Sequence, residues 1–178
     1  MDEDRQGSND NTALIRGHIY SALLRTAALA VVLILIDLYL FGALTVPDND
    51  MFPQIRAGDL AVYYKQGSLA RKDAVIYKTH EGLKAGRIAA APGDTVSRTD
   101  TGLLEINGIL QTIQEREGIF YGTEISAVGS EYPVKLEAGE YFILGDNRSS
   151  AVDSRIAGIV SSDDIQGVVF ILIRRQGV

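Results

Sequence analysis

The stretch that decides the fold is GDNRSSAVDSRIAG, residues 145–158, which follows directly on the apolar run Tyr141–Leu144. A second segment of similar character, GRIAAAPGD, occupies residues 86–94. A Pro-Gly-Asp tripeptide by itself is a common turn. Glycine supplies backbone freedom at such positions. The two segments therefore mark sharp turns after strand-like runs.

Short runs of β-branched, aromatic and aliphatic residues surround these two segments, as is typical of strands. They are residues 60–64, 74–77, 103–106, 109–111, 141–144 and 168–173. Asn107-Gly108 separates two of the runs and is the strongest short signal for a β-hairpin. No segment after Val46 has a long helical period. The sequence therefore predicts a mainly β domain.

One long apolar run, Thr26–Val46, precedes the β-like part and would span about 30 Å as a helix at ~1.5 Å per residue. It is longer than the apolar part of a cleaved secretory signal, which is the alternative, so we predict a retained anchor over 26–46. Arg16 and Arg25 precede it, which places the amino end inside the cell. Asp37, costly in lipid, would face a partner helix or lie near the outer water.

The anchor divides the chain into three predicted parts. Residues 1–25 form a cytoplasmic tail, of which 1–12 are expected to be disordered because they are polar and lack periodicity. Residues 26–46 cross the cell membrane once. Residues 47–178 form the extracytoplasmic domain.

Composition excludes several kinds of function. The net charge of −6 and the scattered lysines and arginines argue against nucleic-acid binding. The chain has no cysteine, which excludes disulfides and thiol chemistry. Its two histidines, His18 and His80, are far apart, so neither a metal site nor a Ser-His-Asp triad is expected. We expect no cofactor and no metal.

Four blocks resemble, in order, the motifs of the type I signal peptidase family. They are Asp50-Met51-Phe52-Pro53 with Gly58-Asp59, Gly86-Arg87 with Pro92-Gly93-Asp94, the hairpin at Asn107-Gly108, and residues 145–158. The resemblance covers about residues 26–175. It implies a signal-peptidase-like antiparallel β-sheet core, from about 50–98 and 141–175, with a smaller inserted β lobe at about 99–140, on one N-terminal transmembrane helix.

The resemblance also places the catalytic positions. The family uses a serine nucleophile and a neutral lysine base, and these positions are Asp50 and Gly86 here. The serine that hydrogen-bonds the lysine corresponds to Ala151. An aspartate is a poor nucleophile toward amides, and glycine has no side chain to serve as base. Lys84 would lie on the same strand face as Gly86, but it would activate nothing. We therefore predict an inactive homologue, not an enzyme.

The remaining site residues are expected to bind or to stabilise. The candidates for client binding are Asp50, Met51, Phe52, Pro53 and Gly86, with packing as the alternative for Met51 and Phe52. Those that resemble the family's structural charges are Arg87, Asp146, Asp153 and Arg155, because buried charges must be paired. Asp50 would favour a client lysine or amino terminus, and Gly86 would leave room for a larger client residue.

The altered dyad positions resemble those of signal-peptidase-like proteins of Gram-positive bacteria that assist sortase-built pili. The resemblance implies a chaperone or assembly factor that binds pilin-like exported polypeptides, with a sortase as a further candidate partner. Two alternatives stay open. The first is an active peptidase that uses Asp50, for example paired with Asp48 in the manner of an aspartic protease. The second is a membrane scaffold for a sortase or translocation partner.

Overall fold

The computed structural model describes residues 3–116, 119–125 and 132–174, and the chain divides into two units, Met1–Leu40 and Phe41–Val178. The first unit is helix α1, Glu3–Leu40. Its segment Tyr20–Leu40 is long and apolar enough to cross a membrane. The prediction of disorder over 1–12 is wrong for the residues from Glu3 on, because the helix already includes them.

The second unit begins earlier than predicted. Strand β1, Phe41–Thr45, pairs antiparallel with β2, Leu60–Tyr64, over the whole length of both strands. Val46 follows β1 and is buried, with its amide donating to the Asp59 carbonyl at 2.9 Å. The predicted anchor 26–46 therefore ends six residues too late. The β-branched and aromatic residues that follow Leu40 belong to the sheet of the domain.

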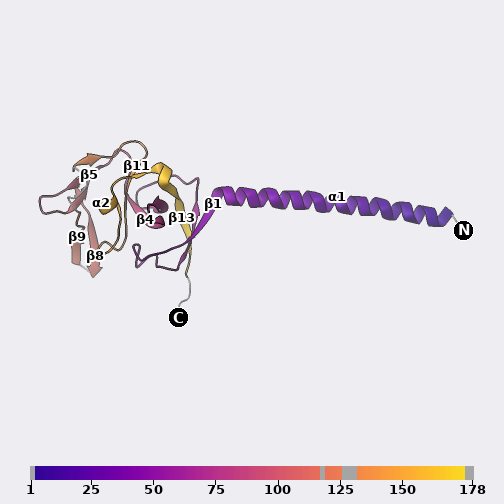
Figure 1. The fold of residues 1–178 in the computed structure, drawn as a ribbon, viewed down its shortest axis with the longest axis horizontal. Helices are drawn as coiled ribbons and strands as arrows, with labels where there is room; N and C mark the ends of the chain where they lie inside the picture. The colour runs from indigo at the N-terminus through magenta and orange to yellow at the C-terminus, as the bar shows by residue number, and fades with distance from the viewer. Residues whose placement is uncertain (1–2, 117–118, 126–131, 175–178) are drawn as a thin grey trace. The chain divides into compact units, whose positions relative to one another are not determined.

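A seven-stranded antiparallel sheet forms the body of the domain (Figure 1). Its order is β1-β2-β13-β3-β4-β11-β12. The strands not yet given are β3, Ala74–Thr79; β4, Gly82–Ala90; β11, Glu140–Leu144; β12, Val160–Ser161; and β13, Ile165–Ile173. Helix α2, Ser154–Ala157, and the 3-10 turn η1, Ser162–Asp164, connect β11 to the last strands.

The inserted lobe contains two smaller sheets. One has the order β10-β5-β6-β7, with β5 at Thr95–Arg98, β6 at Leu104–Ile106, β7 at Ile109–Leu110 and β10 at Val134–Lys135. The other is the hairpin of β8, Thr112–Arg116, and β9, Ile119–Gly122. The lobe begins in β5, slightly before the predicted residue 99.

The lobe and the main sheet share a hydrophobic core. Val96 and Leu104 of the lobe and Phe142 and Leu144 of β11 are all buried in one cluster. A second cluster under β2 contains Met51 and other residues, and a third joins β3, β4 and β11. Because the first cluster spans both parts, burial of apolar area holds the lobe against the sheet.

The mainly β architecture and most of the predicted strands are confirmed. The runs at 60–64, 74–77, 141–144 and 168–173 lie within β2, β3, β11 and β13. The Asn107-Gly108 hairpin is also present, and both residues have positive φ, 54° and 73°, as a type I′ turn requires.

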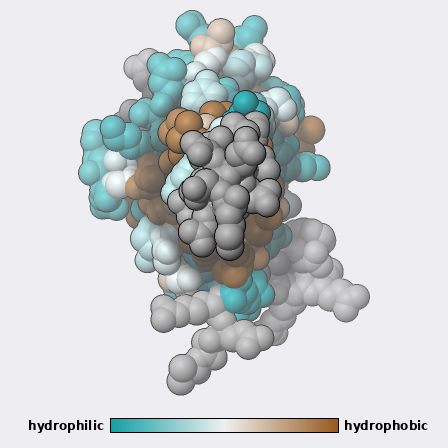
Figure 2. Space-filling view, turned by 90° about the vertical axis from the view of Figure 1, so that its right-hand side faces the viewer, coloured by the Kyte–Doolittle hydropathy of each residue, from teal (hydrophilic) through white to brown (hydrophobic). Residues whose placement is uncertain are grey.

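Apolar side chains are also exposed in two places. Those of α1 between Tyr20 and Leu40 face outward. In the domain, the last residues of β13, Phe170–Ile173, are each 40% exposed or more. In Figure 2, brown apolar residues gather toward the middle of the view and teal hydrophilic residues lie mainly toward its edge.

The pairing of β1 with β2 yields a prediction about where the domain begins. We expect a fragment of residues 41–178 to be more stable than one of residues 47–178, by about 2–4 kcal/mol, because the shorter one loses packed side chains and ladder hydrogen bonds. Urea unfolding measures the difference. A fragment of residues 38–178 is the control and should match 41–178. Equal stability of 41–178 and 47–178 would contradict the role of β1.

Candidate functional site

The loop that carries Asp50 is fixed by buried residues on its far side. Met51 and Ile55 are 0% and 1% exposed. The amide of Ile55 donates to the Met51 carbonyl at 3.0 Å, and that of Phe52 donates to the Asn49 carbonyl at 3.0 Å. The loop thus forms a tight turn whose apolar side packs under β2, which leaves Asp50 at its tip.

The client-binding candidates of this loop separate into two kinds. Met51 is buried in the core, so the expectation that its side chain meets a client is wrong, and its role is packing. Phe52 is 46% exposed and Pro53 is also exposed. The Arg56 guanidinium lies 5.5 Å from the Phe52 ring centroid, a cation–π contact on the surface.

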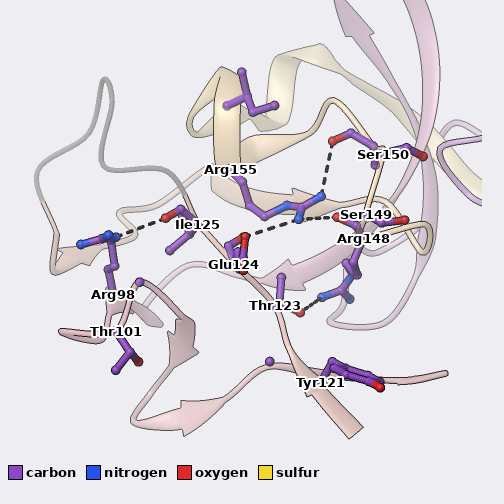
Figure 3. A pocket seen from close by; sticks show the side chains of 14 residues that line it. Arg98, Thr101, Tyr121, Thr123, Glu124, Ile125, Arg148, Ser149, Ser150 and Arg155 are labelled. Atoms are coloured by element: carbon purple, nitrogen blue, oxygen red, sulfur yellow. Dashed lines mark hydrogen bonds between the residues drawn. The ribbon is translucent and has the colours of Figure 1, made fainter. Parts of the chain in front are cut away.

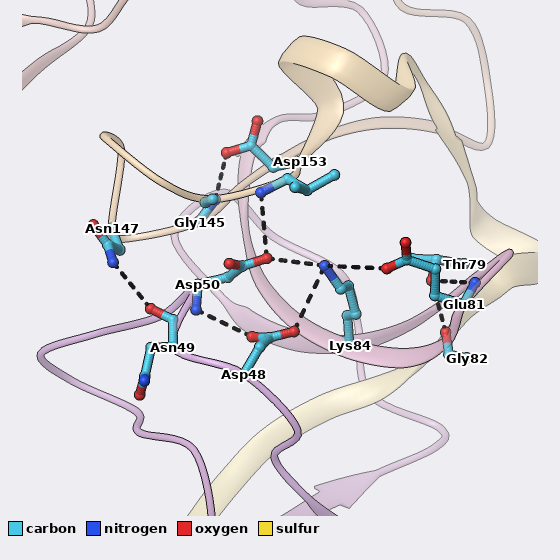
Figure 4. Close-up of polar contacts among 12 residues, drawn as sticks. Asp48, Asn49, Asp50, Thr79, Glu81, Gly82, Lys84, Gly145, Asn147 and Asp153 are labelled. Carbon is cyan, nitrogen blue, oxygen red and sulfur yellow. Dashed lines mark hydrogen bonds and ion pairs between the residues drawn. The ribbon is translucent and has the colours of Figure 1, made fainter.

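Asp50 holds three segments together (Figure 4). Its Oδ2 accepts hydrogen bonds from Lys84 Nζ at 3.0 Å and from the Val152 amide at 3.3 Å. Its carbonyl accepts from the Asn147 amide at 2.9 Å, and its own amide donates to Asp48 Oδ1 at 3.1 Å. The carboxylate therefore joins its own loop to β4 and to the loop after β11.

Lys84 lies among three carboxylates. Its Nζ is 3.0 Å from Asp50 Oδ2, 3.6 Å from Asp48 Oδ2 and 3.9 Å from Glu81 Oε2 (Figure 4). Burial opposes the charge of the ammonium, but the hydrogen bond and charge of Asp50, with the charges of Asp48 and Glu81, raise the pKa of Lys84 above its ordinary value. Lys84 is therefore a protonated partner of Asp50 at neutral pH and cannot accept a proton as a general base.

The position of Gly86 is closed to any side chain. A Cβ atom there would overlap the Cγ2 methyl of Ile143 and lie 2.9 Å from Tyr77 Cε1. Ile143 is 0% and Tyr77 5% exposed, so neither side chain has a free direction in which to move. The expectation that Gly86 opens room for a larger client residue is wrong, because two core side chains occupy that room.

Tyr77 is the site residue that sequence reasoning missed. Burial raises the pKa of its phenol, and the charges of Asp153, Asp50 and Asp48 raise it further. The hydroxyl is therefore neutral at physiological pH. The signal that was available is strand register, because Tyr77 and Lys84 are partners across the β3–β4 hairpin.

The four expected structural charges form two bidentate ion pairs. Arg87 Nε and Nη2 contact Asp146 Oδ1 and Oδ2 at 2.8 and 2.6 Å. Arg155 Nε and Nη2 contact Asp153 Oδ1 and Oδ2 at 2.8 and 2.9 Å. Asp153 is 2% exposed and also accepts from the Gly145 amide at 2.9 Å. Such planar pairs fix the loop after β11.

Ala151 and Gly145 are packed at the back of Asp50. Ala151 is 4% exposed. A Cβ atom at Gly145 would overlap that of Ala151 and would lie 2.6 Å from the Asp50 carbonyl oxygen. The close approach of this loop to Asp50 therefore requires glycine at 145. Among the residues described, no cluster of histidine, aspartate or glutamate side chains could hold a metal ion.

One edge of β4 has no strand partner beside this site. β4 pairs with β3 from Gly82 to Arg87, but β11 pairs with β4 only from Arg87 onward. In the described part of the chain, no strand covers the other edge of residues 82–86. This free edge lies next to Asp50, which contacts Lys84 in the middle of the segment.

These features define an antiparallel β-sheet domain with an Asp50–Lys84 ion pair beside a strand edge, and the comparisons with known proteins identify the family. The family model described as signal peptidase, peptidase S26, matches residues 19–173. The chain therefore belongs to the signal peptidase family.

Several curated relatives cover nearly the whole chain. Signal peptidase I T of Bacillus subtilis is 30% identical and covers 94% of this chain and 92% of its own length. Signal peptidase I of Bacillus licheniformis is 32% identical, with coverage of 78% and 80%. Signal peptidase IB of Staphylococcus aureus (strain COL) is 26% identical, with 87% and 89%. A solved signal peptidase I from Enterococcus faecalis V583 is 26% identical, covers 58% of this chain and 98% of its own, and gives a TM-score of 0.42.

The packing at Gly86 predicts a coupling between positions 86 and 143. We expect Gly86→Ala to destabilise the protein by about 1–3 kcal/mol through overpacking, and Ile143→Ala by about 2–5 kcal/mol through a cavity. The double variant should lose at least about 1 kcal/mol less unfolding free energy than the two single variants lose together, because Ile143→Ala removes the clashing methyl group. Urea unfolding measures all three.

Gly67→Ala is the matched control, since a Cβ there would approach no atom closer than 3.1 Å, on Val168. Gly67→Ala should lower the free energy of unfolding less than Gly86→Ala does, and its effect should add to that of Ile143→Ala. Additive effects of Gly86→Ala and Ile143→Ala would show that the two positions are not in conflict.

The electrostatics of Lys84 predict a measurable pKa change. In Asp50→Asn, the pKa of Lys84 should fall relative to the wild type, because burial still opposes the charge while the main stabilising contact is lost. Because the folded pKa is raised, the ion pair contributes stability below the ordinary value of 10.5 and loses it as pH rises through the folded value. NMR of lysine labelled with ¹³C at Cε follows the titration.

Glu81→Gln is the control for this experiment. Glu81 is farther from Lys84, at 3.9 Å, and its side chain is 79% exposed, so its removal should lower the pKa of Lys84 much less. An unchanged Lys84 pKa in Asp50→Asn would show that the ion pair does not form in solution.

Proposed function

We propose that this chain binds exported polypeptides in an extended conformation without cleaving them. In this proposal it is a non-catalytic member of its family, held at the membrane by α1 with its domain outside the cell. The observation that carries the proposal is the packing at Gly86: Ile143 and Tyr77 occupy the space beside it, so no base can project from that position.

The charges around Asp50 support the same conclusion. A lysine that acts as base must be neutral, and the nearby Lys84 has a raised pKa because of its carboxylate neighbours. An aspartic-protease pair needs two carboxyl groups that share one proton. Here Asp48 and Asp50 both lie within 4 Å of the Lys84 ammonium, so a cation lies beside the two carboxylates.

The free edge of β4 supports peptide binding. An extended peptide can add to an exposed strand edge through main-chain hydrogen bonds, which need neither a serine nor a lysine. The unpaired edge at residues 82–86 lies beside the Asp50–Lys84 pair. The exposed ring of Phe52 offers an apolar contact on the neighbouring loop.

The proposed clients are pilin-like polypeptides, and the proposed role is that of a chaperone or assembly factor for sortase-built pili. Its support is the sequence resemblance at Asp50 and Gly86. A sortase is a further proposed partner. The competing function is peptidase activity through Asp50, which is favoured by the names of the relatives, all signal peptidases.

Photo-cross-linking in the bacterium tests the proposal. A benzoylphenylalanine replaces Phe52 in the full chain, which keeps an aromatic ring at a position that is 46% exposed. We expect cross-links to exported polypeptides, identified by mass spectrometry with pilin subunits among them, and fewer cross-links when Asp50→Ala is added.

The matched control carries the same cross-linker at Ile109, which is 68% exposed and lies at the hairpin of the lobe. It should not give these products. The proposal fails if Phe52 gives no cross-link to an exported polypeptide, or if both positions give the same set.

A further inference from the structure

A second site lies between the inserted lobe and the loop after β11. A cavity of about 860 Å³ opens there, on the surface formed by residues 98–102, 121–125 and 148–156 (Figure 3). Ala151 and Arg155 of the Asp50 site also line it, but none of residues 82–86 does. The cavity is therefore separate from the free edge of β4.

Three arginines and one glutamate give the cavity its charge: Arg98, Arg148, Arg155 and Glu124. Arg155 is neutralised by its bidentate pair with Asp153. Arg98 and Arg148 have no carboxylate within 4 Å among the residues that the structure describes. The cavity thus carries two guanidinium groups that have no ion-pair partner in the described part of the chain, together with the carboxylate of Glu124; Asp153 and Asp146 act on Arg148 only from farther away.

Among the described residues, the hydrogen bonds of Arg98 and Arg148 go to neutral acceptors. Arg98 Nε donates to the Ile125 carbonyl at 3.2 Å. Arg148 Nε donates to the Gly145 carbonyl at 2.7 Å, and its Nη1 donates to Thr123 Oγ1 at 3.1 Å. Burial lowers the pKa of the Arg148 guanidinium, and a charge held out of water in this way gains from an anionic ligand.

The positions of the arginines indicate the kind of ligand. Figure 3 shows Arg98 at one end of the cavity and Arg148 at the other. One small anion would meet only one of them, whereas a chain with two carboxylates can meet both. Exposed side chains of Tyr121 and Ile156, 51% and 64% exposed, line the same cavity and offer apolar contact to a peptide.

We propose that this arginine cavity binds an acidic segment of a polypeptide, with one carboxylate at Arg98 and another at Arg148. It gives the client of the proposed function a second contact, made by residues other than those of the free edge of β4. Glycine at position 102 permits the observed position of the Arg98 guanidinium. A Cβ atom there would lie 3.1 Å from Arg98 Nη2, so the guanidinium lies closely over the glycine.

The test uses two peptides and the full chain in detergent micelles. The probes are acetyl-Gly-Glu-Gly-Gly-Glu-Gly-amide and its glutamine counterpart, with binding followed by NMR. We expect the glutamate peptide to bind, the glutamine peptide to bind at least about tenfold more weakly, and added salt to weaken binding.

Two variants in the same cavity should act in opposite directions. Arg98→Gln removes a positive charge and should weaken binding of the glutamate peptide by about tenfold. Glu124→Gln removes a negative charge and should strengthen that binding. Arg98→Lys keeps the charge and should retain most of the binding. Urea unfolding midpoints equal to the wild type show that the variants are folded.

The proposal is overturned if the glutamine peptide binds as well as the glutamate peptide, or if Arg98→Gln and Glu124→Gln leave binding unchanged. It is also overturned if inorganic phosphate binds as tightly as the glutamate peptide, because the cavity would then be a general anion site. The peptides are not clients, so this test can succeed or fail independently of the cross-linking at Phe52.

Discussion

The rest of the site depends on the close packing of Gly86 against Ile143 and Tyr77. Gly86 is in β4, Tyr77 in β3 and Ile143 in β11, so one contact joins three adjacent strands of the main sheet. Protein interiors are close-packed, and a single added methyl group in such a place must displace something. Whatever this site does, it does without a side chain at position 86.

The electrostatic arrangement follows from that packing. With no side chain at 86, the cation nearest to Asp50 comes from position 84, two residues earlier on the same strand. Lys84 reaches Asp50 at 3.0 Å and is held charged by three carboxylates. The result is an ion pair that ties β4 to the Asp50 loop, where a peptidase of this kind would need a neutral base next to a hydroxyl.

Much of the fold could be predicted from the sequence because its signals are local. The Asn107-Gly108 turn and the aliphatic and aromatic run at Leu60–Tyr64 each indicate their structure within a few residues. The end of the helix at Leu40 could not be predicted from the sequence, because Phe41–Thr45 is apolar enough for either a membrane helix or a strand. Pairing with β2 makes Phe41–Thr45 a strand, and β2 lies in a separate part of the sequence.

Candidate site positions could be proposed from the sequence, but their geometry could not be predicted. Motif spacing located Asp50, Gly86 and Ala151, while the burial of Met51 and the closed space at Gly86 depend on residues from other strands. The arginine cavity had no signal in the sequence at all. Arg98 and Arg148 are 50 positions apart, and only the packing of the lobe against the main sheet brings them to one cavity.

One measurement tests the central claim most directly: intact mass spectrometry of an exported precursor with an Ala-x-Ala site, after incubation with the full chain in lipid vesicles. Our account predicts that the precursor keeps its full mass while it sediments with the vesicles that contain the chain and not with empty ones. A product of mature mass that disappears with Asp50→Ala would contradict it and would show that the chain is a peptidase.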